Sequence, residues 1–271
     1  MSLADRYRVL LVDLDGTIVR GDEPIPGARE ALEAARVRGA RPVFVTNNAT
    51  RTPADVVSHL AAAGVAARPD EVVTSAVATA SMLSARGTRT VRVVGEAALR
   101  SALVVEGIEI LADGPSARPD AVVVGLDRAA TYDSLRTAAF DVQRGAHLVA
   151  TNADGSYPVP GGVAPGAGAL VAALEATTGV AAEVVGKPHP ELLRTARGRA
   201  DAAETLPVLV VGDRLDTDVA GASGLGWDSL LVLTGVTTRE QVEASELRPT
   251  FVAPNLGALV ADPEPGDRSP V

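Results

Sequence analysis

The sequence has no cysteine, only three histidines and few aromatic residues, which make up 3% of its 271 residues. Without cysteine there can be no disulfide, no thiolate nucleophile and no cysteine-ligated zinc or iron–sulfur centre. The histidines, His59, His147 and His189, leave little room for a histidine-based metal site. Any metal ion is therefore expected on carboxylate oxygens.

Long basic runs and long apolar runs are missing as well. The 34 acidic and 25 basic residues give a formal charge of −9, so nucleic acid is a poor candidate partner. Residues 1–8 are polar and mixed in charge, and the apolar run after them is interrupted at Asp13, which fits neither a signal peptide nor a membrane span. We therefore expect a cytoplasmic protein with no membrane partner.

What the chain does contain is an alternation of short β-branched runs with alanine-rich stretches, which is typical of parallel strands joined by helices. Its hydrophobic content of 46% is enough for a buried core. We predict an α/β fold with a doubly wound parallel sheet. The expected strands lie at 9–12, 42–45, 91–94, 121–124, 147–150, 206–211 and 230–233. The expected helices lie at 28–38, between the N-cap Thr52 and the closing Gly64, and at 96–105, 132–144 and 166–177.

Four polar clusters directly follow apolar runs. They are Asp13 with Asp15, Thr46 with Asn47 and Asn48, Gly186 with Lys187 and Pro188, and Gly212 with Asp213. In an open parallel sheet, ligands bind beyond the carboxyl ends of the strands, so segments that are distant in the sequence can converge on one site.

Asp13 and Asp15 lie two positions apart, so a continuing strand would set both carboxylates on the same side. At about 4 Å, two unit charges repel by roughly 4 kcal/mol at an effective dielectric of about 20, so a cation is expected beside them. Magnesium suits such an all-oxygen site. In a phosphotransfer site, Asp13 would attack phosphorus and Asp15 would protonate the leaving alcohol. The alternative is an ordinary strand end, where Asp-Gly forms a polar turn.

The segment 12–17, with the pattern Asp-x-Asp-Gly-Thr after an apolar strand, resembles the first motif of the haloacid dehalogenase (HAD) superfamily of phosphotransferases. Thr46 is similar to the second motif, Lys187 to the third and the segment 212–218 to the fourth, in the expected order. The resemblance covers about residues 8–260, and it implies a magnesium-dependent phosphatase with a Rossmann-like core that forms an aspartyl-phosphate.

The resemblance also implies a role for each matched residue. Thr46 would bind the phosphoryl oxygens, and Lys187 would neutralise both the phosphate and the nucleophile Asp13. Magnesium would be held by the Asp13 side chain, the Asp15 backbone carbonyl and Asp213.

Further residues are predicted around these motifs. Asp218 is expected to orient Lys187 or metal-bound water, whereas Asp216 is interpreted as a solvated charge at a helix start. The predicted substrate-binding residues are Gly16, Thr17, Asn47, Asn48, Asn152 and Asp154. For Asn152 and Asp154, contact with substrate and a role in an ordinary loop turn both stay open. No catalytic role is assigned to His189.

Thr46 and Lys187 are too far apart in the sequence for a single crossover, so a whole domain is expected between them. Together with these two motifs, segments 150–154 and 165–168 are similar to subfamily IIA, the nitrophenyl phosphatase-like enzymes. That group includes phosphoglycolate, glycerol-phosphate and pyridoxal-phosphate phosphatases and nucleotidases. The resemblance implies a large α/β cap that selects the alcohol of a small phosphorylated metabolite, and it suggests homodimerisation through the cap.

We therefore predict a core at 1–87 and 183–262, an inserted smaller α/β cap domain at 88–182, and a flexible tail at 263–271. The Gly- and Pro-rich segment 155–162 is expected to be a loop, in which Tyr157 either packs beneath the loop or faces substrate.

Two alternatives come from other functional classes. A receiver-like phosphoacceptor module also combines a doubly wound sheet with acidic residues, a threonine and a lysine around magnesium. It is shorter than this chain, however, and a slow signalling switch would not need Asp15. A non-catalytic binding protein on the same scaffold would not need the complete set of motif residues.

Overall fold

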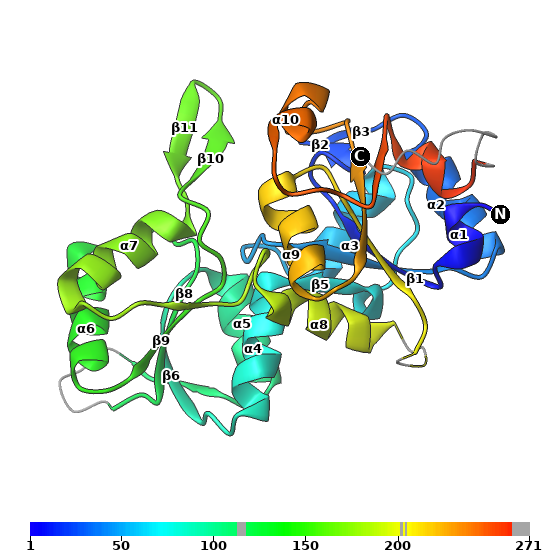
Figure 1. Ribbon diagram of the computed structural model, residues 1–271. Coiled ribbons are helices and arrows are strands. Elements are labelled where there is room, and N and C mark those ends of the chain that lie inside the picture. Colours follow the sequence, from blue (N-terminus) through cyan, green and yellow to red (C-terminus); the bar gives the residue numbers. More distant parts are fainter. Residues whose placement is uncertain (113–117, 201–202, 204, 262–271) are drawn as a thin grey trace. The chain divides into compact units, whose positions relative to one another are not determined.

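The computed structural model describes residues 1–112, 118–200, 203 and 205–261. Its contacts divide the chain into two units, each with a sheet and covering helices (Figure 1). The first unit contains Met1–Thr46, Pro53–Val73 and the chain from Lys187 onward, and the second contains Asn47–Thr52 and Thr74–Gly186. The predicted α/β class is confirmed.

The sheet of the first unit has the strand order β15-β14-β13-β1-β4-β5. Its strands are β1 (Val9–Asp13), β4 (Arg41–Thr46), β5 (Val72–Thr74), β13 (Val208–Gly212), β14 (Asp228–Val232) and β15 (Phe251–Ala253). The pairs from β15 to β4 are all parallel. The first four residues of β1 are buried, as expected for a central strand that is covered on both faces.

Helices and short turns connect these strands. They are α1 (Leu3–Arg6), α2 (Ala28–Val37), α3 (Pro53–Ala62), α8 (Pro190–Arg199), α9 (Ala220–Gly224) and α10 (Arg239–Ala244), the 3-10 turns η1 (Pro69–Glu71) and η3 (Leu256–Leu259), the π-helical turn η2 (Leu215–Val219), and the hairpin β2 (Val19–Arg20) with β3 (Glu23–Pro24). α2 ends just before Gly39, whose φ of +88° favours glycine. Among the described helices, none has the length and apolar character needed to cross a bilayer.

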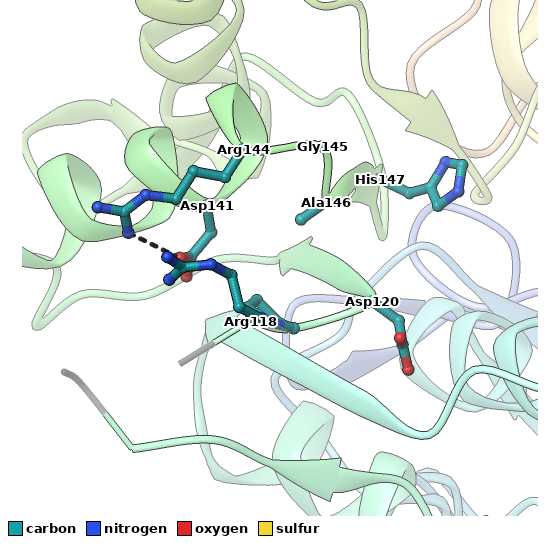
Figure 2. Close-up of a pocket in the computed structure, with 8 residues that line it drawn as sticks. Arg118, Asp120, Asp141, Arg144, Gly145, Ala146 and His147 are labelled. Carbon is teal, nitrogen blue, oxygen red and sulfur yellow. Dashed lines mark ion pairs between the residues drawn. The ribbon is translucent and has the colours of Figure 1, made fainter. Parts of the chain in front are cut away.

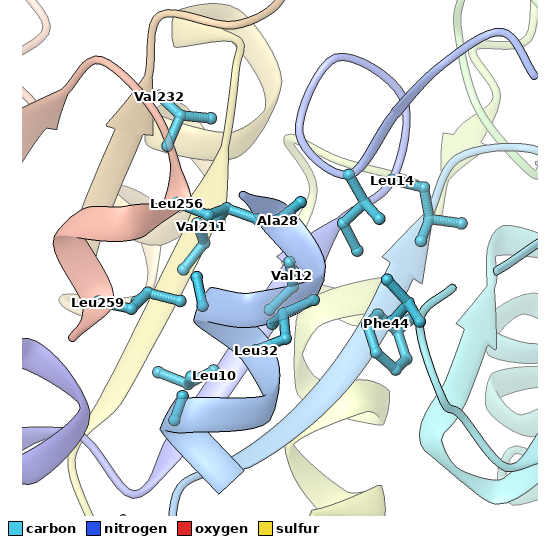
Figure 3. Close-up of a cluster of buried hydrophobic side chains, with 14 of the residues drawn as sticks. Leu10, Val12, Leu14, Ala28, Leu32, Phe44, Val211, Val232, Leu256 and Leu259 are labelled. Carbon is cyan, nitrogen blue, oxygen red and sulfur yellow. The ribbon is translucent and has the colours of Figure 1, made fainter. Parts of the chain in front are cut away.

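The core of the first unit forms where α2 and η3 pack on the sheet (Figure 3). It includes Leu10 and Val12 of β1, Phe44 of β4, Val211 of β13, Ala28 and Leu32 of α2, and Leu256 and Leu259 of η3. Each fully buried leucine or phenylalanine contributes about 1.5–3 kcal/mol relative to exposure. This packing holds β1 in place between its two neighbouring strands.

Strand register brings three of the four predicted motifs, those of Asp13, Thr46 and Asp213, to one edge of this sheet. Asp13 pairs with Val45, the residue before Thr46. β13 ends at Gly212, directly before Asp213, and it runs parallel to β1. The side chains that follow these strands therefore gather at the carboxyl edge, where open parallel sheets bind their ligands.

The second unit has a five-stranded sheet with the order β12-β9-β8-β6-β7, and all of its pairs are parallel. Its strands are β6 (Thr90–Val94), β7 (Glu109–Ile110), β8 (Ala121–Val124), β9 (His147–Ala150) and β12 (Glu183–Val184), and its helices are α4 (Ser75–Ala85), α5 (Ala97–Val105), α6 (Tyr132–Gln143) and α7 (Ala167–Thr178). The N-cap of α6 is Thr131, whose hydroxyl accepts the N–H of Ser134.

Two features of the second unit differ from the sequence prediction. The segment 155–162 was predicted to be a loop, but it contributes to a hairpin of β10 (Ser156–Val159) and β11 (Gly162–Pro165). The Gly and Pro content marked only the turn, where Gly161 has a φ of +92°. α4 also belongs to this unit, so the main segment of the unit starts at Thr74 and not at residue 88. The role of 88–182 as a cap stays a prediction, and the predicted tail lies outside the described residues.

Candidate active site

Lys187 lies between two carboxylates of the first unit. Its ammonium donates hydrogen bonds to Oδ1 of Asp13 at 2.5 Å and to Oδ1 of Asp218 at 2.7 Å. The side chain is buried, and the peptide bond to Pro188 is cis. Burial disfavours the ammonium, but the two carboxylates outweigh it and raise the pKa of Lys187 well above its usual value. Lys187 therefore stays positively charged.

Asp13 ends β1 with its carboxylate bonded to Lys187. Burial raises the pKa of Asp13 well above its usual value, an effect that the Lys187 ammonium opposes and that Asp218 and Asp213 strengthen. One ammonium faces three clustered carboxylates, which leaves two negative charges uncompensated when all of them are ionised. A divalent cation would balance this charge and keep Asp13 ionised.

Asp213 follows β13, and the surroundings of its two carboxylate oxygens differ. Its Oδ2 accepts the N–H of Val236 at 2.6 Å. Its Oδ1 is buried and forms no hydrogen bond within the part of the chain that the structure describes. Burial raises the pKa of Asp213 to about 6. A buried carboxylate oxygen in this state is costly unless a ligand satisfies it.

These residues fit a magnesium ion. Carboxylate oxygens of Asp13, Asp213 and Asp218 lie within 4.8 Å of one another, and oxygen is the ligand that Mg²⁺ prefers. Oδ1 of Asp213 is available as such a ligand. Asp218 was predicted to orient Lys187, and its oxygens bind Lys187 and the N–H of Arg214. Asp13 and Asp213 are therefore the two carboxylates of the cluster that could hold the ion, beside the Asp218–Lys187 pair.

The turn after β1 contains the other residues of the first motif. Asp15 is exposed, and its side chain is not a member of the acidic cluster. The sequence prediction gave only its backbone carbonyl as a ligand of the metal ion. Gly16 has a φ of +82°, and a Cβ there would lie 2.4 Å from Oδ2 of Asp213. The turn thus requires glycine for both its backbone conformation and the close approach of Asp213. Thr17 is fully buried, and its hydroxyl forms no hydrogen bond with any described residue.

The chain leaves the first unit directly after Thr46, which is buried at the end of β4. In the second unit, the carbonyl of Asn47 accepts hydrogen bonds from the Ser75 hydroxyl at 2.6 Å and from the Asn152 amide at 2.8 Å. The Asn152 side chain therefore holds the loop that follows Thr46.

The remaining predicted substrate contacts surround this loop. Oδ1 of Asn152 accepts the N–H of Asp154 at 3.1 Å, and the Asn47 amide lies 3.5 Å from Oδ2 of Asp154. Asn48 closes a local turn, because its Oδ1 accepts both the N–H and the hydroxyl of Thr50. The structure thus brings Asn47, Asn152 and Asp154 together within the second unit.

Three residues without an assigned role have other contacts. Asp216 is 67% exposed and pairs with Arg214, in agreement with a solvated charge. His189 occupies the N-cap position of α8 without a capping hydrogen bond from its side chain. The hydroxyl of Tyr157 accepts a hydrogen bond from Arg128, whose guanidinium lies 5.9 Å from the ring centroid. Tyr157 thus anchors the β10–β11 hairpin.

One contributor to the site was missed in the sequence. The segment 234–237 follows β14, supplies the Val236 N–H to Asp213, and binds the carbonyl of Gly16 through the Thr234 hydroxyl. No recognised motif marks this segment. Its position after a predicted strand, at the same edge of the sheet as Asp13, was the available signal.

A separate pocket of about 310 Å³ lies in the second unit (Figure 2). It is lined by Arg118, Pro119, Asp120, Asp141, Arg144, Gly145, Ala146 and His147. The carboxylate of Asp141 is occupied by the buried Arg92 and by Arg144, and Asp120 accepts two backbone N–H groups. His147 points away from Asp141 in Figure 2. This pocket contains none of the predicted metal or substrate residues.

Comparisons with known proteins agree with the motifs. Residues 10–109 match the family model described as haloacid dehalogenase-like hydrolase, and residues 184–259 match a second model for HAD-like hydrolases. An acid sugar phosphatase of Staphylococcus saprophyticus is 37% identical over 259 residues, which cover 95% of this chain and 98% of that protein. A D-glycerol 3-phosphate phosphatase of Mycobacterium tuberculosis is 40% identical, over 98% of this chain and 76% of its own length.

Solved structures are similar throughout the chain. A glycerol phosphate phosphatase from Mycobacterium tuberculosis in complex with magnesium has a TM-score of 0.89 at 40% identity, over 96% of this chain and 78% of the other. A 4-nitrophenylphosphatase from Thermotoga maritima has a TM-score of 0.87 at 35% identity, over 96% of this chain and 98% of the other.

Proposed function

The chain belongs to the haloacid dehalogenase-like hydrolases, and on this basis we infer that it is a magnesium-dependent phosphatase of small phosphate monoesters. The observation that carries the inference is the Lys187 ammonium between Asp13 and Asp218, beside the unsatisfied Oδ1 of Asp213. Phosphoryl transfer needs a positioned nucleophile and fixed positive charge around the phosphate, and all of these residues lie in the first unit.

In the proposed reaction, Asp13 attacks phosphorus in line, and the bond from phosphorus to the alcohol oxygen breaks as the aspartyl-phosphate forms. Asp15 protonates the departing alcohol. It then takes a proton from the water that hydrolyses the aspartyl-phosphate, which releases phosphate and restores Asp13. Lys187 stays charged and neutralises the phosphoryl oxygens, and the Thr46 hydroxyl donates to one of them.

The Asp13 and Asp213 side chains and the Asp15 carbonyl would hold Mg²⁺. When bound, the ion supplies further charge neutralisation for the transferring phosphoryl group. Gly16, Thr17, Asn47, Asn48, Asn152 and Asp154 stay proposed substrate contacts. Gly16 and Thr17 are supported by their position in the turn beside Asp213. The four others are supported by their position around the loop after Thr46. Cytoplasmic location and homodimerisation stay predictions from the sequence.

We propose glycerol 3-phosphate as the first candidate substrate, because a D-glycerol 3-phosphate phosphatase is 40% identical over nearly the whole chain. The test is kcat/KM for glycerol 3-phosphate, phosphoglycolate, sugar phosphates, pyridoxal phosphate and nucleotides, with Mg²⁺ and with EDTA. Turnover that requires Mg²⁺ is expected. A stable phosphoprotein without turnover would indicate a phosphoacceptor module instead, and binding without either would indicate a non-catalytic protein.

Asp15→Asn is expected to lower kcat for glycerol 3-phosphate by about a hundredfold, because the alkoxide leaves poorly without protonation. With nitrophenyl phosphate, whose leaving group needs no acid, a fast burst of about one nitrophenolate per chain should precede slow hydrolysis of the aspartyl-phosphate. Rapid-quench measurements would detect the burst. The matched control is Asp133→Asn, the same change at a carboxylate that is 75% exposed in the second unit. Equal losses on both esters without a burst would contradict the acid–base role.

Magnesium is expected to stabilise the protein more at pH 8 than at pH 5. Since burial raises the pKa of Asp213 to about 6, the folded chain without Mg²⁺ holds a proton between about pH 4 and 6 that the unfolded chain has lost. Its free energy of unfolding therefore falls as pH rises through this window, and Mg²⁺ binds the ionised form that appears.

At about 100 times its Kd, Mg²⁺ should raise Tm by roughly 5–10 °C at pH 8 and by less at pH 5. Differential scanning fluorimetry would measure both increases, and Asp213→Asn, which removes the titrating ligand, serves as the control. An increase that is independent of pH, or one that persists in this variant, would be inconsistent with the assignment of Asp213.

A further inference from the structure

The carboxylate of Asp213 is held between two glycines. A Cβ on Gly16 would lie 2.4 Å from Oδ2 of Asp213, and a Cβ on Gly235 would lie 1.9 Å from the same oxygen. Neither distance can be accommodated unless the carboxylate moves. Position 235 therefore requires glycine, because any side chain there would occupy the space of the Asp213 carboxylate.

Arg20 donates to the Thr234 carbonyl and the N–H of Leu215 to the Thr237 hydroxyl. Three other hydrogen bonds join the segment 234–237 to Asp213 and Gly16. The N–H of Val236 donates to Oδ2 of Asp213 at 2.6 Å, and the N–H of Thr237 donates to the Asp213 carbonyl at 3.2 Å. The Thr234 hydroxyl donates to the carbonyl of Gly16 at 2.6 Å. The segment is thus bound both to the acidic residue and to the turn after β1.

These contacts distinguish the two oxygens of Asp213. A partial rotation of the carboxylate out of this orientation would break the bond from Val236, and the two glycine backbones leave little room for it. Oδ2 is consequently occupied by the protein, and Oδ1 is left without a partner among the described residues.

We propose that Thr234, Gly235 and the N–H of Val236 form a positioning segment. This segment fixes the Asp213 carboxylate so that Oδ1 alone binds a divalent cation, and the inference rests on the proposed function. Thr234 touches neither the ion nor the substrate. Its hydroxyl bonds the segment to the Gly16 turn, so that Gly16 and Gly235 both stay packed against the Asp213 carboxylate. Loss of such an outer partner typically weakens metal binding by about 10- to 100-fold.

The test is the Kd for Mg²⁺ alone, measured by isothermal titration on chain purified without metal and by the Mg²⁺ dependence of Tm. Thr234→Val keeps the shape of the side chain and removes the donor, so the Kd should rise about tenfold. Thr234→Ser keeps the donor and should bind Mg²⁺ like the parent. The control Thr250→Val removes a hydroxyl that bonds Asp228 and Ser229 at the other end of β14, so it should lower stability without changing the Kd.

Gly235→Ala is a second, independent variant. Its Cβ would displace the Asp213 carboxylate, so the loss of Mg²⁺ binding should exceed that of Thr234→Val. A parental Kd in Thr234→Val, or one that Thr234→Ser fails to restore, would overturn the inference. Asp213→Asn tests the proposed metal site separately from the positioning role. Parental Mg²⁺ binding in this variant would refute the metal site itself. If binding is lost in Asp213→Asn but kept in Thr234→Val, only the positioning role is wrong.

Discussion

Asp13→Asn is expected to abolish steady-state phosphate release, with kcat reduced by at least about a thousandfold. The carboxamide is a poor nucleophile, and it removes one of the two proposed ligand carboxylates. The fold should survive, because asparagine has the shape of aspartate and Lys187 keeps its bond to Asp218. The measurements are kcat with nitrophenyl phosphate and Mg²⁺, and acid-quench trapping of a phosphorylated chain.

Asp218→Asn is the matched control for this variant. Asp218 also binds the Lys187 ammonium, so the change disturbs the same cluster without removing the proposed nucleophile. This variant should turn over more slowly than the parent but still yield a trapped phosphoprotein. A phosphoprotein that forms in Asp13→Asn at the parental level would assign the nucleophile to another residue.

Lys187→Met should damage stability and activity together. The variant leaves the carboxylates of Asp13 and Asp218 buried next to each other without the ammonium between them. Breaking a buried pair in this way costs about 3–5 kcal/mol of the free energy of unfolding. We expect kcat to fall by about a thousandfold, since fixed charge at the phosphoryl oxygens is lost as well. Urea unfolding and kcat, both at pH 8, would measure these effects.

The pH dependence of this variant is a further check. Unpaired buried carboxylates have raised pKa values, so the folded variant binds protons that the unfolded chain has released. Its stability deficit should therefore shrink between pH 8 and pH 5. Asp133→Asn, which leaves the cluster intact, should show no such recovery. A deficit that is the same at both pH values would mean that packing, and not charge, makes Lys187 necessary.

The strands and their motif ends could be predicted because both signals are local. A β-branched run predicts β1 or β13, and a polar residue directly after it indicates the binding edge of the sheet. These positions locate Asp13, Thr46 and Asp213, whereas Lys187 follows β12 of the other sheet and was identified through the family resemblance. The composition held a further indication. Lys187 is the one lysine among 25 lysines and arginines. Its ammonium is a compact point charge that lies between two carboxylates, a position that a planar guanidinium would fill differently.

Contacts between distant segments could not be predicted from the same signals. The Val236 N–H reaches Asp213 only because β14 pairs with β13, which no residue pattern in 234–237 reveals. The Asn152 amide bonds the carbonyl of Asn47, which is 105 residues away, so the sequence left its role open. The β10–β11 hairpin was missed because its composition indicates a turn but not the pairing of the strands beside it.

β1 lies between β4 and β13, and its Val9 pairs with Val208, about 200 residues later in the chain. A ribosome that adds about 5–20 residues per second needs roughly 10–40 s to synthesise that distance. Thr74–Gly186, which forms most of the second unit, is complete before β13 emerges. The inserted unit can therefore fold while one edge of β1 is still open. Asp13 and Asp213 can meet only after β13 has been synthesised, so the candidate site is completed later than most of the second unit.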